Sequence, residues 1–219
     1  MTRRRSPIAV TLTTLILLVA TTIGHAAELA GVTMADRHDV AGEHLALNGM
    51  AVRDKFFIKV YVGGLYLPKH MTNADDILRA DIPKALLMQF VRDVKRDKLV
   101  QAYREAFASN APDLAASQKA NVDQFFAFLT DVKEGDRIGF AYEPGKGSRL
   151  SLNGSDKLTI AGKAFADLFL LVYIGPHPPT AEVKRGHTKS SGGPAPTIAF
   201  IDVPAFQQFH IAHLKLTAK

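Results

Sequence analysis

Residues 51–68, AVRDKFFIKVYVGGLYLP, constrain the fold more than any other stretch of this chain. Apolar and polar residues alternate over its middle, with the period of a β-strand that has one buried face. The apolar face carries Phe56, Ile58, Val60 and Val62. The opposite face carries Arg53, Lys55, Phe57, Lys59 and Tyr61. We therefore predict one long strand whose second face is either solvated or lines a pocket.

Short strands and turns are predicted around this stretch. Strands are expected at 29–34, 39–40 and 44–47, and Asn48-Gly49 is expected to turn the chain into the long strand. Gly63-Gly64 removes two side chains, which indicates a bulge, a bend or a close backbone approach. The opening of the domain should therefore be antiparallel.

The rest of the domain alternates between helical and extended patterns. Residues 84–91 are apolar on both faces, which predicts a central strand covered on both sides. Apolar residues at helical spacing predict helices at 97–109, 113–130 and 163–174, and Thr72 or Asn73 can cap a short helix that ends at Ala80. Alternation with turn residues predicts a β-meander over 137–160.

The two ends differ in character from the middle. Three arginines at 3–5, an apolar run at 8–23 and small residues before Ala27 predict a signal peptide, residues 1–26, cleaved after Ala26. The apolar run is shorter than the ~20 residues of a spanning helix, so we expect a periplasmic or secreted protein without a transmembrane span, with an uncleaved anchor as the alternative. One domain is expected at 27–186, followed by a linker and a loosely attached tail at 187–219.

Composition excludes several functions. The chain has no cysteine, which excludes disulfides and thiolate metal sites. Its formal charge of +6 falls to +3 without residues 1–26, and the dispersed cations do not suggest a nucleic-acid surface. Gly145-Lys146-Gly147-Ser148 lacks the upstream glycine of a phosphate loop, and His210 and His213 have no third ligand nearby. No metal or cofactor is therefore expected.

The cationic strand remains as the candidate site. Arg53 offers a planar fork for a carboxylate or phenolate, Lys59 adds a point charge, and the Tyr61 hydroxyl can donate to an oxyanion. Arg53 and Tyr61 are ~26 Å apart in a straight strand, so they can share a ligand only if the chain bends. Arg92, at the end of the predicted central strand, either joins the site or caps the sheet edge.

Several separated motifs together resemble the bacterial branch of the chalcone isomerase-like family. They are LNGMAVRDKFFIKVYVGGLYLP, LLMQFVRDV, DVKEGDRIGFAYEPGKGSRLSLNG and the apolar helix followed by GPHPPT, which together run from about Gly31 to about Arg185. The resemblance implies an α+β fold, the open-faced β-sandwich, in which helices are layered on one side of a large antiparallel sheet. It also implies a small-molecule cleft between the sheet and the helices.

The resemblance leaves three functions open. Plant enzymes of the family close a chalcone with a strand arginine, a strand threonine and helix-borne hydroxyls. Arg53 matches the arginine and Tyr61 the threonine, whereas the helix positions fall near Leu114 and Val172, which have no hydroxyl. Non-enzymatic relatives look like fatty-acid binders that use an arginine and a tyrosine, which implies a binder of a small amphipathic anion held by Arg53 and Tyr61. From the residues themselves, Lys59 and Arg92 are further candidate cations of this site, and Phe57 is expected to wall the tail of the ligand. The alternatives are an intramolecular lyase acting on a phenolic enone and a structural module without a ligand.

Overall fold

Seven strands form one antiparallel sheet in which each strand pairs with the next along the chain. The computed structural model describes residues 26–55 and 58–176. The strand order is β3 (Arg37–Val40), β4 (Glu43–Lys55), β5 (Ile58–Leu67), β6 (Lys84–Phe90), β7 (Arg137–Glu143), β8 (Gly147–Leu152) and β9 (Ser155–Ile160). β6 is the middle strand, as its two apolar faces predicted.

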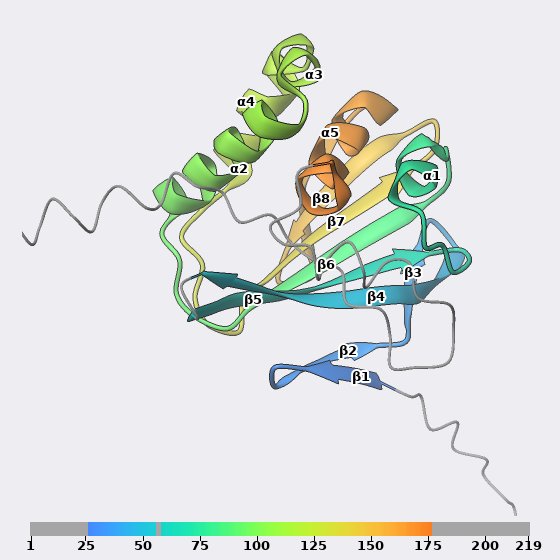
Figure 1. Cartoon of the computed structure of the whole chain (residues 1–219), viewed down its shortest axis with the longest axis vertical. Coiled ribbons are helices and arrows are strands. Elements are labelled where there is room, and N and C mark those ends of the chain that lie inside the picture. Colours follow the sequence, from blue (N-terminus) through green and yellow to red (C-terminus); the bar gives the residue numbers. More distant parts are fainter. Residues whose placement is uncertain (1–25, 56–57, 177–219) are drawn as a thin grey trace, which may run out of the picture.

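The helices lie together on one side of this sheet (Figure 1). They are α1 (Ala74–Arg79), α2 (Arg96–Asn110), α3 (Pro112–Ser117), α4 (Lys119–Phe128) and α5 (Lys163–Ile174). Eight of the twelve residues of α5 are buried, which confirms that this apolar helix lies in the interior. The predicted helix over 113–130 was wrong in one respect, because the chain breaks it at Gln118 into α3 and α4. The predicted fold, an open-faced sandwich with one helical layer, is confirmed.

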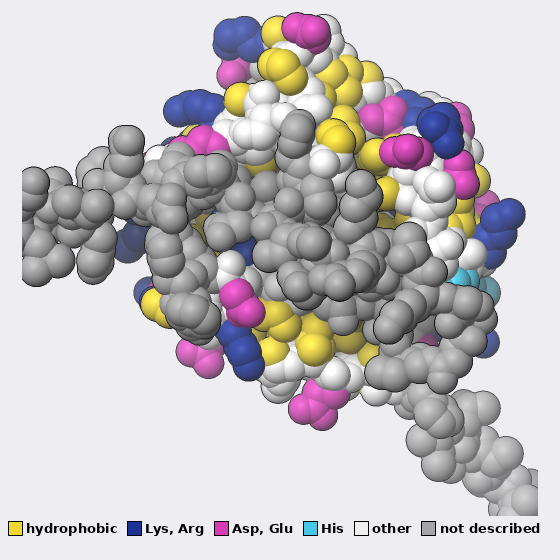
Figure 2. Space-filling model, in the orientation of Figure 1, with side chains coloured by type: hydrophobic (Ala, Val, Ile, Leu, Met, Phe, Trp, Pro, Cys, Tyr) yellow, Lys and Arg dark blue, Asp and Glu magenta, His cyan; other side chains and the backbone are white. Residues whose placement is uncertain are grey.

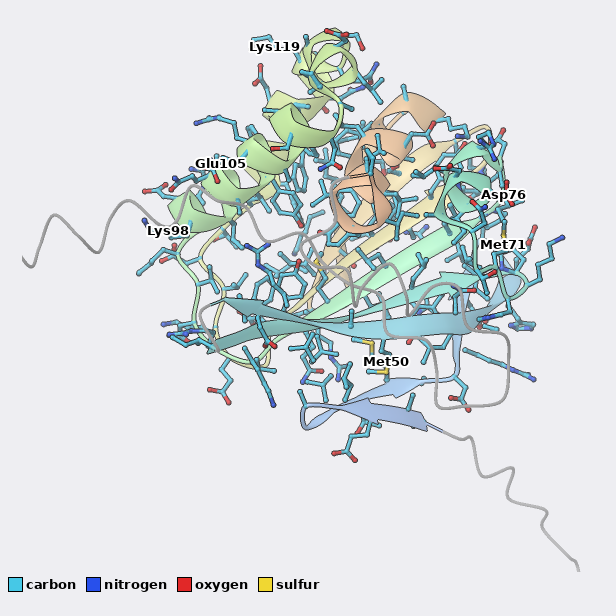
Figure 3. The ribbon with its side chains drawn as sticks, viewed as in Figure 1. Met50, Met71, Asp76, Lys98, Glu105 and Lys119 are labelled. Carbon is cyan, nitrogen blue, oxygen red and sulfur yellow. The ribbon has the colours of Figure 1, made fainter. Side chains whose placement is uncertain are left out.

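A small hairpin lies on the other side of the sheet. The single strand predicted over 29–34 is instead β1 (Ala26–Leu29) and β2 (Val32–Ala35), joined by a tight turn. Val32 and Met34 of β2 pack on Met50 and Val62 of the sheet, and Figure 3 shows Met50 on the side that faces this hairpin. A Cβ placed on Gly64 would lie 2.5 Å from the Met34 sulfur, so the close-approach interpretation of this glycine was correct.

The long strand predicted over 51–68 was wrong. Residues 51–55 and 58–67 belong to two strands, β4 and β5, which pair antiparallel, and Arg53 is the cross-strand partner of Tyr61. A single strand of that length would extend ~60 Å, which is longer than the strands of a domain this size. Pairing the two strands instead satisfies the backbone hydrogen bonds of both. Ile58, assigned to the apolar face, begins β5 and is 51% exposed.

Asn48-Gly49 is not the predicted turn. Both residues lie inside β4, where the pairing with β5 shifts register between Leu47 and Gly49. The buried Asn48 side chain donates to the Met71 carbonyl (3.0 Å) and accepts from the Met71 amide (2.8 Å). At this shift in register, the Asn48 side chain therefore makes hydrogen bonds to the backbone of Met71, and these bonds join β4 to the segment before α1.

Charged side chains of both signs are spread over the visible described surface, as the dispersed sequence pattern predicted (Figure 2). Within the described residues no helix is long and apolar enough to cross a membrane. The predicted signal peptide, apart from Ala26, and the predicted tail at 187–219 lie outside the described residues.

Candidate functional site

Arg53 and Tyr61 meet across the β4–β5 hairpin, on the face of the sheet that the helices cover. They are directly opposite one another in the register, so the separation expected for a straight strand does not arise. Tyr61 is 7% exposed and belongs to the core beneath the helices, whereas Arg53 is half-buried. Burial raises the pKa of Tyr61, and the Arg53 guanidinium opposes this through its charge and hydrogen bonding. Two of the predicted site residues are therefore brought together.

Two further tyrosines face this pair from the helical layer. Tyr103 comes from α2 and Tyr173 from α5, and their hydroxyl oxygens lie 2.5 Å apart. The Met88 sulfur on β6 accepts from the Tyr173 hydroxyl at 3.2 Å and lies 3.8 Å from the Tyr103 hydroxyl. The site thus combines residues from five elements and places three phenols near one guanidinium.

Electrostatics keep all three phenols protonated. Burial raises the pKa of Tyr61, Tyr103 and Tyr173 above the ordinary value, and the positive charge of Arg53 offsets this only in part. The neighbouring phenols raise these pKa values further, because Tyr61 acts on Tyr103, and both Tyr61 and Tyr103 act on Tyr173. At neutral pH these hydroxyls therefore serve as hydrogen-bond donors and acceptors, not as anions or general bases.

Aromatic packing fixes the tyrosine rings. The Tyr103 ring contacts the Phe125 ring edge-on with centroids 4.7 Å apart, and stacks on Phe169 at 5.9 Å. Tyr61 lies edge-on to Phe90, its cross-strand partner on β6, at 5.5 Å. Because these contacts come from the sheet and from three helices, the hydroxyls are held in place by the whole core.

The prediction that the helices bring no hydroxyl to the site was wrong. Leu114 lies half-buried on α3, and Val172 is buried beside Tyr173 on α5. The hydroxyls come instead from Tyr103 and Tyr173. Tyr103 was assigned to an apolar helical stripe, and Tyr173 is the hydroxyl-bearing residue of an otherwise apolar helix. A tyrosine on a fully buried stripe needs a partner for its hydroxyl, and that signal pointed to both residues.

The other predicted residues lie elsewhere. Lys59 is exposed on β5 beyond Tyr61, and its cross-strand partner is Asp54. Arg92 is exposed just after β6. Phe57 lies outside the described residues. Arg53 is the cation whose charge acts on all three phenols.

The side chains suit an organic anion or a carbonyl oxygen, because they offer a guanidinium and hydroxyl donors. Within the described part of the chain, no group of three His, Cys, Asp or Glu side chains could hold a metal ion. His210 and His213 lie outside that part.

Comparison with known proteins assigns the chain to a family. The family model described as chalcone isomerase-like matches residues 26–186. The chain belongs to the chalcone isomerase-like family. Among solved structures, the chain is similar to a fatty-acid binding protein of Arabidopsis thaliana, with 15% sequence identity and a TM-score of 0.57. The match covers 70% of this chain and 91% of the plant protein.

The structural likeness establishes the chalcone isomerase-like fold of this chain and nothing finer, because the identity is low. No curated protein sequence matches the chain significantly. The chemistry of this family member must therefore be argued from Arg53, Tyr61 and the two helix-borne tyrosines.

Proposed function

We propose that this protein binds a small amphipathic anion, such as a fatty acid, with its carboxylate at Arg53 and Tyr61. The observation that carries the proposal is the cross-strand Arg53–Tyr61 pair, whose tyrosine belongs to the buried aromatic core. The fatty-acid binding protein with the same fold supports it as an analogy.

The pair suits a carboxylate for two reasons. A guanidinium has five N–H donors in a planar fork, so Arg53 can bond Tyr61 and a carboxylate together. A hydroxyl oxygen that accepts from a guanidinium keeps its own O–H, which Tyr61 can direct to the same carboxylate. Charge-assisted hydrogen bonds of this kind contribute ~1.5–3 kcal/mol each, so apolar contacts must supply most of the affinity.

The apolar part of the ligand would lie between the sheet and α2. Phe90 of β6 lies beside Tyr61 on that side, and Leu99 of α2 belongs to the same core cluster. A flexible acyl chain can occupy such a space by displacing apolar side chains without leaving a polar group unpaired. We also propose that Phe57 contacts the apolar tail of the ligand.

An intramolecular lyase is the second candidate, because three protonated hydroxyls and a guanidinium could stabilise the oxyanion of a phenolic enone. The geometry favours the binder. Tyr103 and Tyr173 share one hydrogen bond with each other and another with the Met88 sulfur, so their protons are engaged within the core. Lyase chemistry would have to break this arrangement.

We also propose that the protein is exported, to the periplasm or beyond, after removal of residues 1–26. The support is the arginine-rich start, the apolar run and the small residues that follow it. Cell fractionation of the tagged full-length chain tests this. A signal confined to the cytoplasm, at the unprocessed mass, would overturn it.

Native mass spectrometry with organic extraction tests the binding role. The full chain is purified as wild type, Arg53→Gln, Tyr61→Phe and Arg104→Gln. Arg104 is exposed on α2 and contacts the Phe126 ring, so it is a matched arginine control away from the hydroxyls. We expect a fatty acid to co-purify with wild type and with Arg104→Gln, and to be lost or reduced about tenfold or more in Arg53→Gln.

The same proteins separate the alternatives. Tyr61→Phe should retain less ligand than wild type but more than Arg53→Gln, because it loses one donor and no charge. An empty wild type that also fails to take up added oleate would contradict the carrier role. Loss of absorbance of a hydroxychalcone, dependent on Arg53, would then support the lyase. Neither binding nor turnover would leave the structural-module interpretation.

A further inference from the structure

A groove lies on the face of the sheet opposite the helices. Its volume is about 660 Å³, within the ~300–1,000 Å³ of small-molecule sites. Leu87 of β6 and Gly139 and Ala141 of β7 line its base, and residues 33–39 and the β8–β9 hairpin form its sides. The groove is separated from Arg53 and Tyr61 by the sheet itself, because those side chains point to the helical layer.

The base of the groove is low and apolar. Gly139 contributes no side chain and Ala141 only a methyl group. The Ser151 hydroxyl and the Leu87 side chain occupy the space above Gly139, because a Cβ on this glycine would lie 2.4 Å from the Ser151 hydroxyl oxygen and 3.3 Å from a Leu87 methyl carbon. Leu87, Ala141 and Ser151 therefore form a low floor on which a flat ring can lie.

Cations predominate around the groove. Three arginines line it, and they are Arg37, Arg137 and Arg149. The acids that line it are already engaged: Asp156 pairs with Arg149 at 3.2 Å, and Asp39 with His44 at 2.5 Å. Among the described residues, neither Arg37 nor Arg137 has a carboxylate at ion-pair distance. Arg137 makes a neutral contact through its Nε, which donates to Gln89 at 2.8 Å.

The walls are close enough for their charges to act across the groove. β3 packs against β6 and β7, and Arg37 on this strand lines the groove. Burial lowers the pKa of His38 on β3, the Asp39 carboxylate opposes this, and Arg149 on β8 lowers the pKa again, so this histidine stays neutral at neutral pH. Burial and the Asp36 carboxylate raise the pKa of Tyr66 on β5 to about 12, and the charge of Arg137 on β7 opposes the rise. Two arginines without acidic partners therefore face one narrow space.

We propose that this groove is a second binding site, which takes a small organic anion with a flat apolar body. Arg37 and Arg137 hold the carboxylate or phosphate of the ligand, and the apolar body lies on Leu87, Ala141 and Ser151. A guanidinium fork matches the geometry of both anions, and an anion between the arginines removes their mutual repulsion. The site works independently of the Arg53–Tyr61 pair.

Fluorescence titration of the full chain with 1-naphthoate tests the proposal. The chain has no tryptophan, so naphthyl emission can be followed without that background. Matched variants are the double variant Arg37→Gln/Arg137→Gln for the groove, Arg53→Gln for the other site and Arg104→Gln as the surface control. We expect saturable binding to wild type, Arg53→Gln and Arg104→Gln, and at least a tenfold weaker affinity in the double variant.

Two further probes define what is recognised. 1-Naphthyl phosphate should bind in the same way, and uncharged 1-naphthamide at least tenfold more weakly. Amide NMR shifts on naphthoate binding should centre on Leu87, Gly139 and Ser151. Three results would each overturn the proposal. They are a loss of naphthoate binding in Arg53→Gln without a loss in the double variant, binding of naphthamide as tight as that of naphthoate, and no saturable binding of naphthoate to wild type. Unchanged thermal unfolding of the double variant excludes misfolding as the cause, and if it unfolds early the single Arg37→Gln variant is compared instead.

Discussion

Lys84 is a buried cation whose removal should stabilise the protein. It opens β6, is 0% exposed, and its ammonium donates to the Ala80 carbonyl at 2.7 Å, at the end of α1. The ammonium also lies 5.8 Å from the centre of the Tyr142 ring. Burial, aided by the charge of Lys163, lowers the Lys84 pKa from 10.5 to about 8, although nearby carboxylates oppose the change.

The sign of the pH effect follows from these two values. Below pH 8 the lysine is charged in both states, and the folded protein bears the cost of burying that charge. Between about pH 8 and 10.5 the folded protein has lost the proton while the unfolded chain still holds it, so stability rises with pH. At ~1.36 kcal/mol per pKa unit, the gain between pH 7 and pH 10 is about 2.5 kcal/mol.

We predict that Lys84→Met is about 1–2 kcal/mol more stable than wild type at pH 7. Methionine has a similar shape and no charge, so the variant avoids the desolvation cost but loses the hydrogen bond to Ala80, which is worth ~1 kcal/mol. At pH 10, where the wild-type lysine is neutral when folded, the order should reverse, with the variant about 1 kcal/mol less stable.

Urea unfolding followed by circular dichroism at pH 7, 8, 9 and 10 measures this. Lys69→Met, at an exposed lysine, is the matched control and should follow wild type at every pH. The comparison stops at pH 10, because the buried tyrosines have raised pKa values and favour unfolding above that point. A wild-type stability that does not rise relative to Lys84→Met between pH 7 and 10 would refute the reasoning.

Three further predictions concern stability measured by urea unfolding at pH 7. Gly147→Ala should cost about 3 kcal/mol or more, because φ is +114° and the new Cβ would lie 2.2 Å from a backbone oxygen, whereas Gly145→Ala, at φ +77° with open space around it, should cost only about 1 kcal/mol. Phe169→Ala should cost ~3–5 kcal/mol, since the ring is fully buried and stacked within the aromatic core; a loss under 1 kcal/mol would mean that the core collapses around it. Asn48→Leu should cost ~2–4 kcal/mol by leaving both backbone groups of Met71 unpaired, and an unchanged unfolding midpoint would show that water replaces the side chain.

Local pattern predicted most of the elements correctly. The central strand, the apolar final helix, the meander from β7 to β9 and the short capped helix all follow from periods of 2 and 3.6 residues and from turn residues. The Asn73 side chain caps α1 as expected, accepting from the Asp76 amide at 3.1 Å. The errors arose where one local pattern fits two structures. Alternation alone cannot distinguish one long strand from the two arms of a hairpin, so residues 51–68 were predicted as one piece.

The candidate site was only partly predictable. Arg53 and Tyr61 were selected because a guanidinium and a hydroxyl on one face suit an anion, and that chemistry depends on residue type alone. Their direct contact depends on the register of β4 and β5, which is fixed by pairing along the whole hairpin. Tyr103 and Tyr173 were missed, because an apolar helical stripe says which face is buried but not which side chain of another helix it meets.

The sequence by itself thus determined the order and type of most elements and the type of chemistry on the cationic stretch, because these follow from interactions between residues close along the chain. The layered α+β arrangement was expected from the resemblance to the family. Tertiary structure alone decided that Arg53, Tyr61, Tyr103 and Tyr173 gather around Met88, that Arg37 and Arg137 face one groove, and that Lys84 is buried with its charge. Each of these depends on packing between segments tens of residues apart, where burial changes the pKa of a group and the partners of its hydrogen bonds.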